Sequence, residues 1–139
     1  MISLAQAQTI VTHALAHARS HSLKALAVVV LDAGGHPVAM AREDGATFFR
    51  ADIARAKAYG ALGMGDDTAA IAERAKGNPA FYSGVIATVG GNLVLSPGGV
   101  LVRDGGVVVG AVGVSGDTGP MDAACAQAGI AAAGLEFAA

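Results

Sequence analysis

The most constraining feature of the sequence is an unbroken apolar run, Val28-Val29-Val30-Leu31, within the segment 25–32. A strand with one wet face alternates apolar and polar residues, whereas a continuous β-branched run is typical of a strand buried on both faces. The run ends at Asp32-Ala33-Gly34-Gly35-His36-Pro37, where paired glycines supply the positive φ of a tight turn. Because 38–42 is again strand-like, the sequence predicts a hairpin in a sheet on which helices pack.

Further patterns place helices before and after this hairpin. Ser3 and Gln6 have capping-box spacing, which predicts a helix running to about His21. Its apolar face is expected to contain Leu4, Ala7, Val11, Leu15 and Ala18. Later helices are predicted at 49–64, 68–76 and 121–133, and strands at 85–89, 100–103 and 107–114, with 93–95 left open as a short strand.

This order, α-β-β-α-α-β-β-β-α, predicts an α/β (α+β) fold. Tight turns join consecutive strands, so we expect a mostly antiparallel five-stranded sheet flanked by helices. With 139 residues, the chain is expected to form a single domain, 1–139.

Composition excludes several classes of protein. Hydrophobic residues make up 53% and charged residues 14%, so the chain has enough apolar surface to fold. Nine Lys and Arg against 11 Asp and Glu provide no excess of cations for nucleic acid, and aromatic residues are only 4%. The apolar excess of so small a domain instead favours a homo-oligomer interface.

Targeting signals and cysteine chemistry are also constrained. The longest apolar run, 25–31, is far below the ~18–20 residues that cross a bilayer, so we expect no membrane association. Met1-Ile2-Ser3 leads directly into a helical pattern without a basic segment, which favours a cytoplasmic protein. The single cysteine, Cys125, is interpreted as a packed small residue.

Three histidines form the clearest candidate for a ligand site. His13, His17 and His21 lie four residues apart, so on a helix they form one stripe that rises about 6 Å per step. The stripe could be solvated, hold a metal through an i, i+4 pair, supply one axial ligand to haem, or transfer protons. Two histidines of one helix cannot bind both faces of one haem, because axial ligands approach from opposite sides.

Charged residues later in the chain give two further candidates. Arg42, Asp44 and Arg50, with Lys57 two turns along, could hold a carboxylate or a propionate, or form an ordinary surface ion-pair cluster. Asp122 lies near the start of the last helix, where the helix dipole alone favours an acid and a catalytic role is the alternative.

The glycines of 110–116 do not fit a dinucleotide fingerprint, since they would follow hairpin strands. Close packing of a helix or a second subunit on the strand is the favoured interpretation, and the floor of a pocket is the other.

Taken in order, these segments resemble the GlcG/HbpS family, the haem-degrading or haem-binding domain that also forms the C-terminal domain of PduO-type proteins. The resemblance covers nearly the whole chain. It is carried by the segments 27–36, 42–46, 56–58, 90–91, 110–116 and 122–130. The chain departs from the family at Leu93-Val94-Leu95, where members often have a proline-containing segment, and in lacking the export signal of the secreted members.

The resemblance implies a profilin-like arrangement and self-assembly into dimers or larger rings. It also implies haem or a related tetrapyrrole as the ligand of some members, with a first-helix histidine on the iron. That role can fall only on the His13, His17 and His21 stripe, and His17 ranks first because it lies mid-stripe.

Three functions therefore compete. The first is haem binding through His17, with Arg42, Arg50 or Lys57 on a propionate. The second is a small-molecule enzyme, an isomerase, lyase or hydrolase, acting on a carboxylated catabolite at a subunit interface. Arg42 or Arg50 would hold the carboxylate, and Asp44, Asp122 or a histidine would move protons. The third is a regulatory assembly module that binds a partner protein through its apolar faces.

Overall fold

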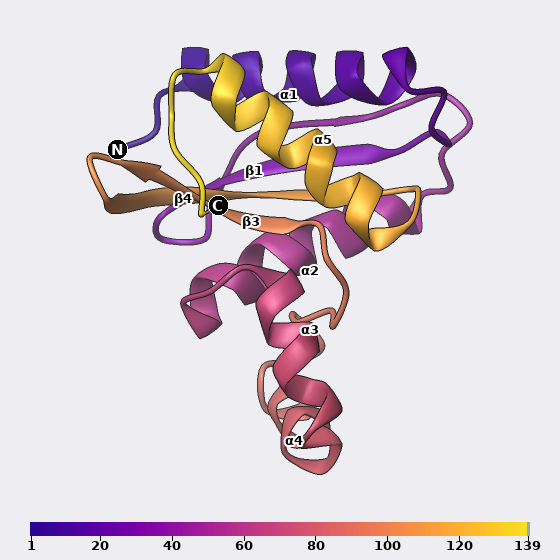
Figure 1. The fold of residues 1–139 in the computed structure, drawn as a ribbon, viewed down its shortest axis with the longest axis vertical. Coiled ribbons are helices and arrows are strands. Elements are labelled where there is room, and N and C mark those ends of the chain that lie inside the picture. Colours follow the sequence, from indigo (N-terminus) through magenta and orange to yellow (C-terminus); the bar gives the residue numbers. More distant parts are fainter. Residues whose placement is uncertain (139) are drawn as a thin grey trace.

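The structure is a computed structural model that describes residues 1–138. This part of the chain forms five helices and four strands (Figure 1). In chain order they are α1 (Leu4–Ser20), β1 (Ala27–Asp32), β2 (Pro37–Arg42), α2 (Phe49–Met64), α3 (Thr68–Lys76), α4 (Pro79–Thr88), β3 (Gly99–Asp104), β4 (Val107–Ser115) and α5 (Gly119–Ala132). None of these helices is both long enough and apolar enough to cross a membrane.

The strands form one antiparallel sheet in the order β2-β1-β4-β3. The two predicted hairpins, β1–β2 and β3–β4, are both confirmed. The two apolar strands β1 and β4 pair with each other at the centre, where Val29 lies opposite Gly113. The most continuous apolar run is therefore in a central strand, whose backbone hydrogen bonds are made with the neighbouring strands on both sides, β2 and β4.

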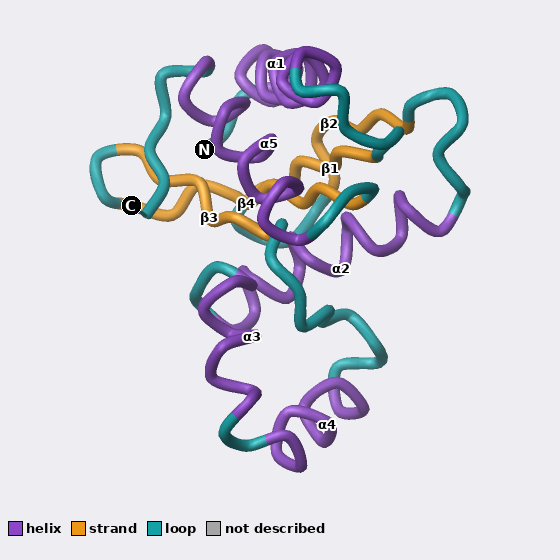
Figure 2. The backbone as a smooth tube through the Cα atoms, turned by 45° about the vertical axis from the view of Figure 1, so that its right-hand side comes forward, coloured by secondary structure: helices purple, strands orange, loops and turns teal. Residues whose placement is uncertain are grey.

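Both faces of β1 are buried, as the Val28–Leu31 run predicts. Val28 and Val30 pack into a core shared with α1 and α5, whereas Val29 and Leu31 pack against α2. Figure 2 shows the sheet between these two layers, with α1 and α5 on one side and α2 on the other. Each buried Val or Leu contributes about 1.5–3 kcal/mol, so this central strand contributes substantially to the stability of the sheet.

Close backbone packing explains the glycines of β4. The alanine-rich face of α2, which includes Ala54 and Ala58, lies directly on Gly113. A Cβ atom built on Gly113 would overlap the carbonyl oxygen of Ala54. The close-packing interpretation of this segment is therefore confirmed.

The five-stranded sheet is wrong, because the predicted strand at 85–89 lies in α4 and its C-cap. Pro79 occupies the first turn of α4, where its missing N–H removes no hydrogen bond. Tyr82 and Leu93 pack with Ile71 in a small third core, with Val85 against them, so this segment buries its apolar residues at helical spacing. The segment 93–95 forms no strand either, and α3 and α4 project away from the sheet (Figure 1).

The buried face of α1 is rotated from the predicted one. Leu4 is 56% exposed, while Ile10 and Ala14 are fully buried. The cause is α5, which packs along α1 so closely that a Cβ on Gly129 would meet the carbonyl oxygen of Ile10 at 2.5 Å. The buried face is therefore rotated toward the histidine stripe, of which His17 is half-buried and His13 and His21 are exposed.

The profilin-like arrangement, the single-domain boundaries and the cytoplasmic location stay predictions.

Candidate functional site

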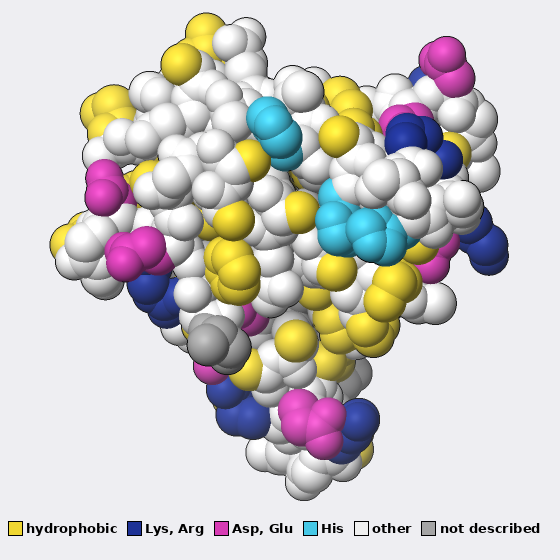
Figure 3. Space-filling view, turned by 45° about the horizontal axis from the view of Figure 1, so that its top comes forward, with side chains coloured by type: hydrophobic (Ala, Val, Ile, Leu, Met, Phe, Trp, Pro, Cys, Tyr) yellow, Lys and Arg dark blue, Asp and Glu magenta, His cyan; other side chains and the backbone are white. Residues whose placement is uncertain are grey.

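The three histidines of α1 and its C-cap differ in their exposure to solvent. His13 and His21 are exposed, and His17 is half-buried. The rings of His17 and His21 stack with their centroids 4.0 Å apart and their planes 23° apart. Figure 3 shows two histidine side chains side by side on this surface, with hydrophobic side chains nearby.

Hydrogen bonds fix the tautomers of two of these rings. His13 Nδ1 lies 2.9 Å from the Thr9 carbonyl oxygen, and His21 Nδ1 lies 2.9 Å from the His17 carbonyl oxygen. A carbonyl oxygen only accepts, so each Nδ1 carries the proton and donates it. When these imidazoles are neutral, Nε2 keeps its lone pair, which is the form that binds a metal.

The electrostatics of His17 favour the same neutral form. Partial burial, followed by the neighbouring charge of His21, lowers the pKa of His17 below its usual value. His17 is therefore neutral at pH 7 and above. Of the three rings, His17 is the least exposed.

The four residues predicted to bind a carboxylate do not all lie together in the structure. Arg42 and Asp44 line one surface depression of about 430 Å³, together with Arg19 and Glu43. Arg42 donates to the Ala46 carbonyl oxygen at 2.6 Å, and Asp44 is exposed. The structure thus brings these two predicted residues together.

Arg19 and Glu43 were missed by the sequence analysis. Arg19 Nε lies 2.9 Å from Glu43 Oε2, and Glu43 Oε1 also accepts from the Leu26 amide. These residues are separated by 24 positions, so no local spacing links them. Their pairing arises only when α1 packs beside β1 and β2.

Arg50 and Lys57 lie elsewhere. Arg50 is half-buried at the start of α2 and donates to Ser115 Oγ at 3.2 Å. Lys57 is 3% exposed, and its Nζ donates to the Val114 carbonyl oxygen at 3.0 Å. Lys57 therefore lies on the inward face of α2, and its role as a ligand contact stays a prediction.

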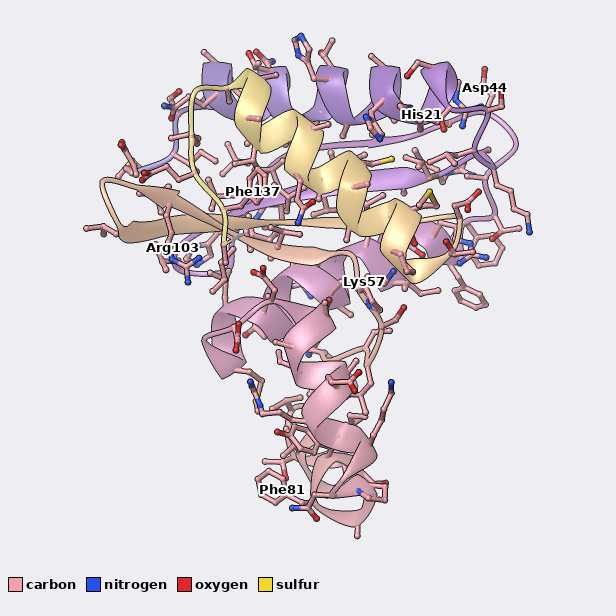
Figure 4. The ribbon with its side chains drawn as sticks, in the orientation of Figure 1. His21, Asp44, Lys57, Phe81, Arg103 and Phe137 are labelled. Carbon is pink, nitrogen blue, oxygen red and sulfur yellow. The ribbon has the colours of Figure 1, made fainter. Side chains whose placement is uncertain are left out.

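Asp122 is the partner of Lys57. It is 1% exposed, and its Oδ2 lies 3.1 Å from Lys57 Nζ. Figure 4 shows Lys57 beside the N-terminal end of α5. Its Oδ1 accepts from the Asp117 amide at 2.9 Å. Burial raises the pKa of Asp122 and lowers the pKa of Lys57, and the contact between them opposes both shifts. The pair joins α2, β4 and α5, which is a structural arrangement, and it presents no exposed carboxylate to a substrate.

Cys125 follows one turn later on α5 and is fully buried. Burial raises the pKa of its thiol to about 11. The interpretation of Cys125 as a packed residue is confirmed. No group of three or more His, Cys, Asp or Glu side chains gathers anywhere in residues 1–138 in a way that could enclose a metal ion.

Comparison with known protein families assigns the chain to one of them. Residues 2–131 match the model of the HbpS-like family, described as haem-degrading HbpS-like proteins. The chain belongs to this family, which confirms the resemblance inferred from the sequence. No curated protein matches it.

Several solved structures share the fold. A PduOC:haem complex superposes with a TM-score of 0.89 at 24% identity, over 99% of both chains. The ORFY protein of Klebsiella pneumoniae has a TM-score of 0.88 at 29% identity, over 96% of this chain and 90% of that one. A double mutant of HbpS from Streptomyces reticuli has a TM-score of 0.80 at 27% identity, over 94% and 85%.

Proposed function

We propose that this protein binds haem or a related tetrapyrrole, with His17 as the axial ligand of the metal. The observation that carries the proposal is the half-buried imidazole of His17 on α1, which stacks on His21 and whose lowered pKa favours the neutral form. Membership of the HbpS-like family and the fold shared with a PduOC:haem complex support the same ligand.

The number of ligands that the protein can supply fits a metal ion already coordinated by a macrocycle. A porphyrin supplies four nitrogen atoms, so the protein needs to add only one imidazole on a given face. His17 and His21 are on one stripe and stack, so only one of them can reach the metal from that face. His21 then acts as a positioning residue, because its ring restricts the rotation of His17.

Free cations are available for the propionates. Arg42 uses one nitrogen on the Ala46 carbonyl oxygen, and Arg50 contacts the neutral hydroxyl of Ser115. Neither forms an ion pair with an acid in the described part of the chain. Either guanidinium can therefore form charge-assisted hydrogen bonds with a carboxylate.

Titration with hemin tests the assignment. We expect a shifted Soret band that saturates with the wild-type protein and is lost in His17→Ala. His13→Ala is the matched control, because His13 is on the same stripe and its loss should leave the band in place. An unchanged band in His17→Ala would overturn the role of His17.

A second candidate function is an enzyme acting on a small carboxylated molecule. The depression that contains Arg42 and Asp44 favours it, because a guanidinium and an exposed carboxylate share one concave surface. Arg42 would hold the substrate carboxylate and Asp44 would move a proton. Mass spectrometry of the ligand that co-purifies with the protein separates the two functions: a tetrapyrrole supports the first and a small acid the second.

We also propose that the chain forms a homo-oligomer. Phe48 and Phe49 are 70% and 64% exposed, and Met40 is exposed on the edge strand β2. Adjacent exposed aromatic residues beside an unpaired sheet edge are typical of an interface. Light scattering at micromolar concentration tests this, and a monomeric mass would contradict it.

A further inference from the structure

A small apolar cavity lies between α2 and α4, on the side of the sheet opposite the histidine stripe. It has a volume of about 70 Å³ and is lined mainly by Tyr59, Gly63, Met64, Val85, Val89 and Asn92. A wider depression of about 200 Å³ shares Tyr59 and Gly63 and continues to the β1–β2 turn.

Two glycines of α2, Gly60 and Gly63, line the cavity. A Cβ atom on Gly63 would meet no atom within 4 Å, so packing does not require glycine there. Gly60 differs, because a Cβ atom at that position would lie 2.6 Å from Leu93 Cδ1. Alanine is the better helix former, so glycine at position 63 lowers the stability of α2.

Arg55 places one positive charge beside the cavity. Its guanidinium carbon lies 5.0 Å from the centroid of the Tyr59 ring, and its Nη1 donates to Asn92 Oδ1 at 3.4 Å. Tyr59 and Asn92 both line the cavity. Within residues 1–138, Arg55 forms no ion pair.

The surrounding walls carry no compensating charge. The segment from Gly77 to Val102 contains no Asp, Glu, Lys or Arg, and the lining residues of the cavity are all uncharged. An apolar hollow with a single unpaired guanidinium at its rim is complementary to a molecule with one negative end and one apolar end.

We propose that this cavity binds a small monocarboxylic acid with a compact aliphatic tail. The tail fills the space beside Gly63, and the carboxylate contacts Arg55. An apolar cavity of about 150 Å³ holds a benzene ring, so one of about 70 Å³ encloses only part of an isobutyl tail, and the rest extends into the adjoining depression of about 200 Å³. The site is independent of the haem proposal, since α1 and α2 pack on opposite faces of the sheet.

Titration with isovalerate, followed by NMR of the ¹⁵N-labelled protein, tests the site. We expect saturable shifts of the Tyr59, Val85 and Val89 amides, with binding in the millimolar range. Isovaleramide, which has the same shape and no charge, should bind about tenfold more weakly because it loses the charged contact with Arg55. Absence of shifts at these amides would overturn the proposal.

Two variants locate the ligand. Gly63→Leu should abolish the shifts by filling the cavity, whereas Gly84→Leu should retain them, since Gly84 is also helical and open but lies outside the lining. Arg55→Gln should reduce isovalerate affinity about tenfold and leave isovaleramide unchanged. If Gly63→Leu does not fold, equal isovalerate affinity in wild type and Arg55→Gln overturns the site by itself. Hemin binding serves as the separate readout of the His17 site and should not change in any of these variants.

Discussion

Lys57 of α2 and Asp122 of α5 form a buried ion pair, with 3.1 Å between Nζ and Oδ2. The two residues are 65 positions apart, and their pairing ties together helices from opposite faces of the sheet. Val114 and Asp117 complete the hydrogen bonds of this pair through their backbone.

Removing one partner of this pair should destabilise the fold strongly. Asp122→Ala leaves the Lys57 ammonium buried without its counter-charge, and we expect a loss of about 3–5 kcal/mol in the free energy of unfolding. Urea denaturation measures it. The exposed residue Asp44 provides the control, since Asp44→Ala should change stability by less than about 0.5 kcal/mol. Equal, small losses in both variants would contradict a structural role for the pair.

Two glycine substitutions should change the free energy of unfolding in opposite directions. Gly113→Ala introduces a Cβ that overlaps the carbonyl oxygen of Ala54, so we expect a loss of about 1–3 kcal/mol in the free energy of unfolding. Gly63→Ala places its Cβ in open space on a helix and should gain up to about 1 kcal/mol. Thermal denaturation of both variants checks this. A stable Gly113→Ala protein would show that α2 does not approach β4 as closely as described.

The ionisation of His17 should respond to its neighbour. The pKa of His17 is lowered first by partial burial and then by His21. In His21→Ala, the NMR titration midpoint of His17 should therefore rise, yet remain below that of a free histidine, because the larger cause persists. A midpoint that does not move would mean that the stacked pair is absent in solution.

The same shift sets the sign of a pH effect. Because the pKa of His17 is lower in the folded than in the unfolded state, the unfolded chain binds more protons between the two values. The contribution of His17 to stability is present above pH ~6.5 and is lost as pH falls through the folded pKa. Haem affinity should fall over the same acidic range, which spectrophotometric titration at several pH values can measure.

Cys125 should be chemically silent in the folded protein. Its buried thiol has a pKa raised to about 11, so almost no thiolate is present at pH 8. Iodoacetamide should modify the protein at pH 8 only after urea is added, as followed by mass spectrometry. Rapid modification of the native protein would instead place Cys125 at an accessible surface.

Much of the fold could be predicted because its signals are local. The bounds of α2 follow from its helical pattern, and the glycine turns define both hairpins. The error at α4 arose because the run around Val85 and Ile86 is short, apolar and β-branched, which strands and helices share. The spacing of Tyr82, Val85, Ile86 and Val89 is helical and could have identified it.

The candidate sites also divide into those that local spacing in the sequence predicts and those that depend on tertiary packing. The histidine stripe and its ranking depend on spacing within one helix, and the sequence contains that spacing. The separation of Lys57 from Arg42, and the pairing of Arg19 with Glu43, depend on how distant elements pack. The cavity beside Gly63 depends on how α4 packs against α2, so no sequence pattern could reveal it.

Replacing the His17 side chain and then supplying free imidazole tests the central claim most directly. His17→Gly should lose the hemin spectrum of the wild type, and millimolar imidazole should restore it, because the added ring can occupy the vacated axial position. His13→Gly with the same additions should match the wild type throughout. Retention of the wild-type spectrum by His17→Gly before imidazole is added would contradict the account.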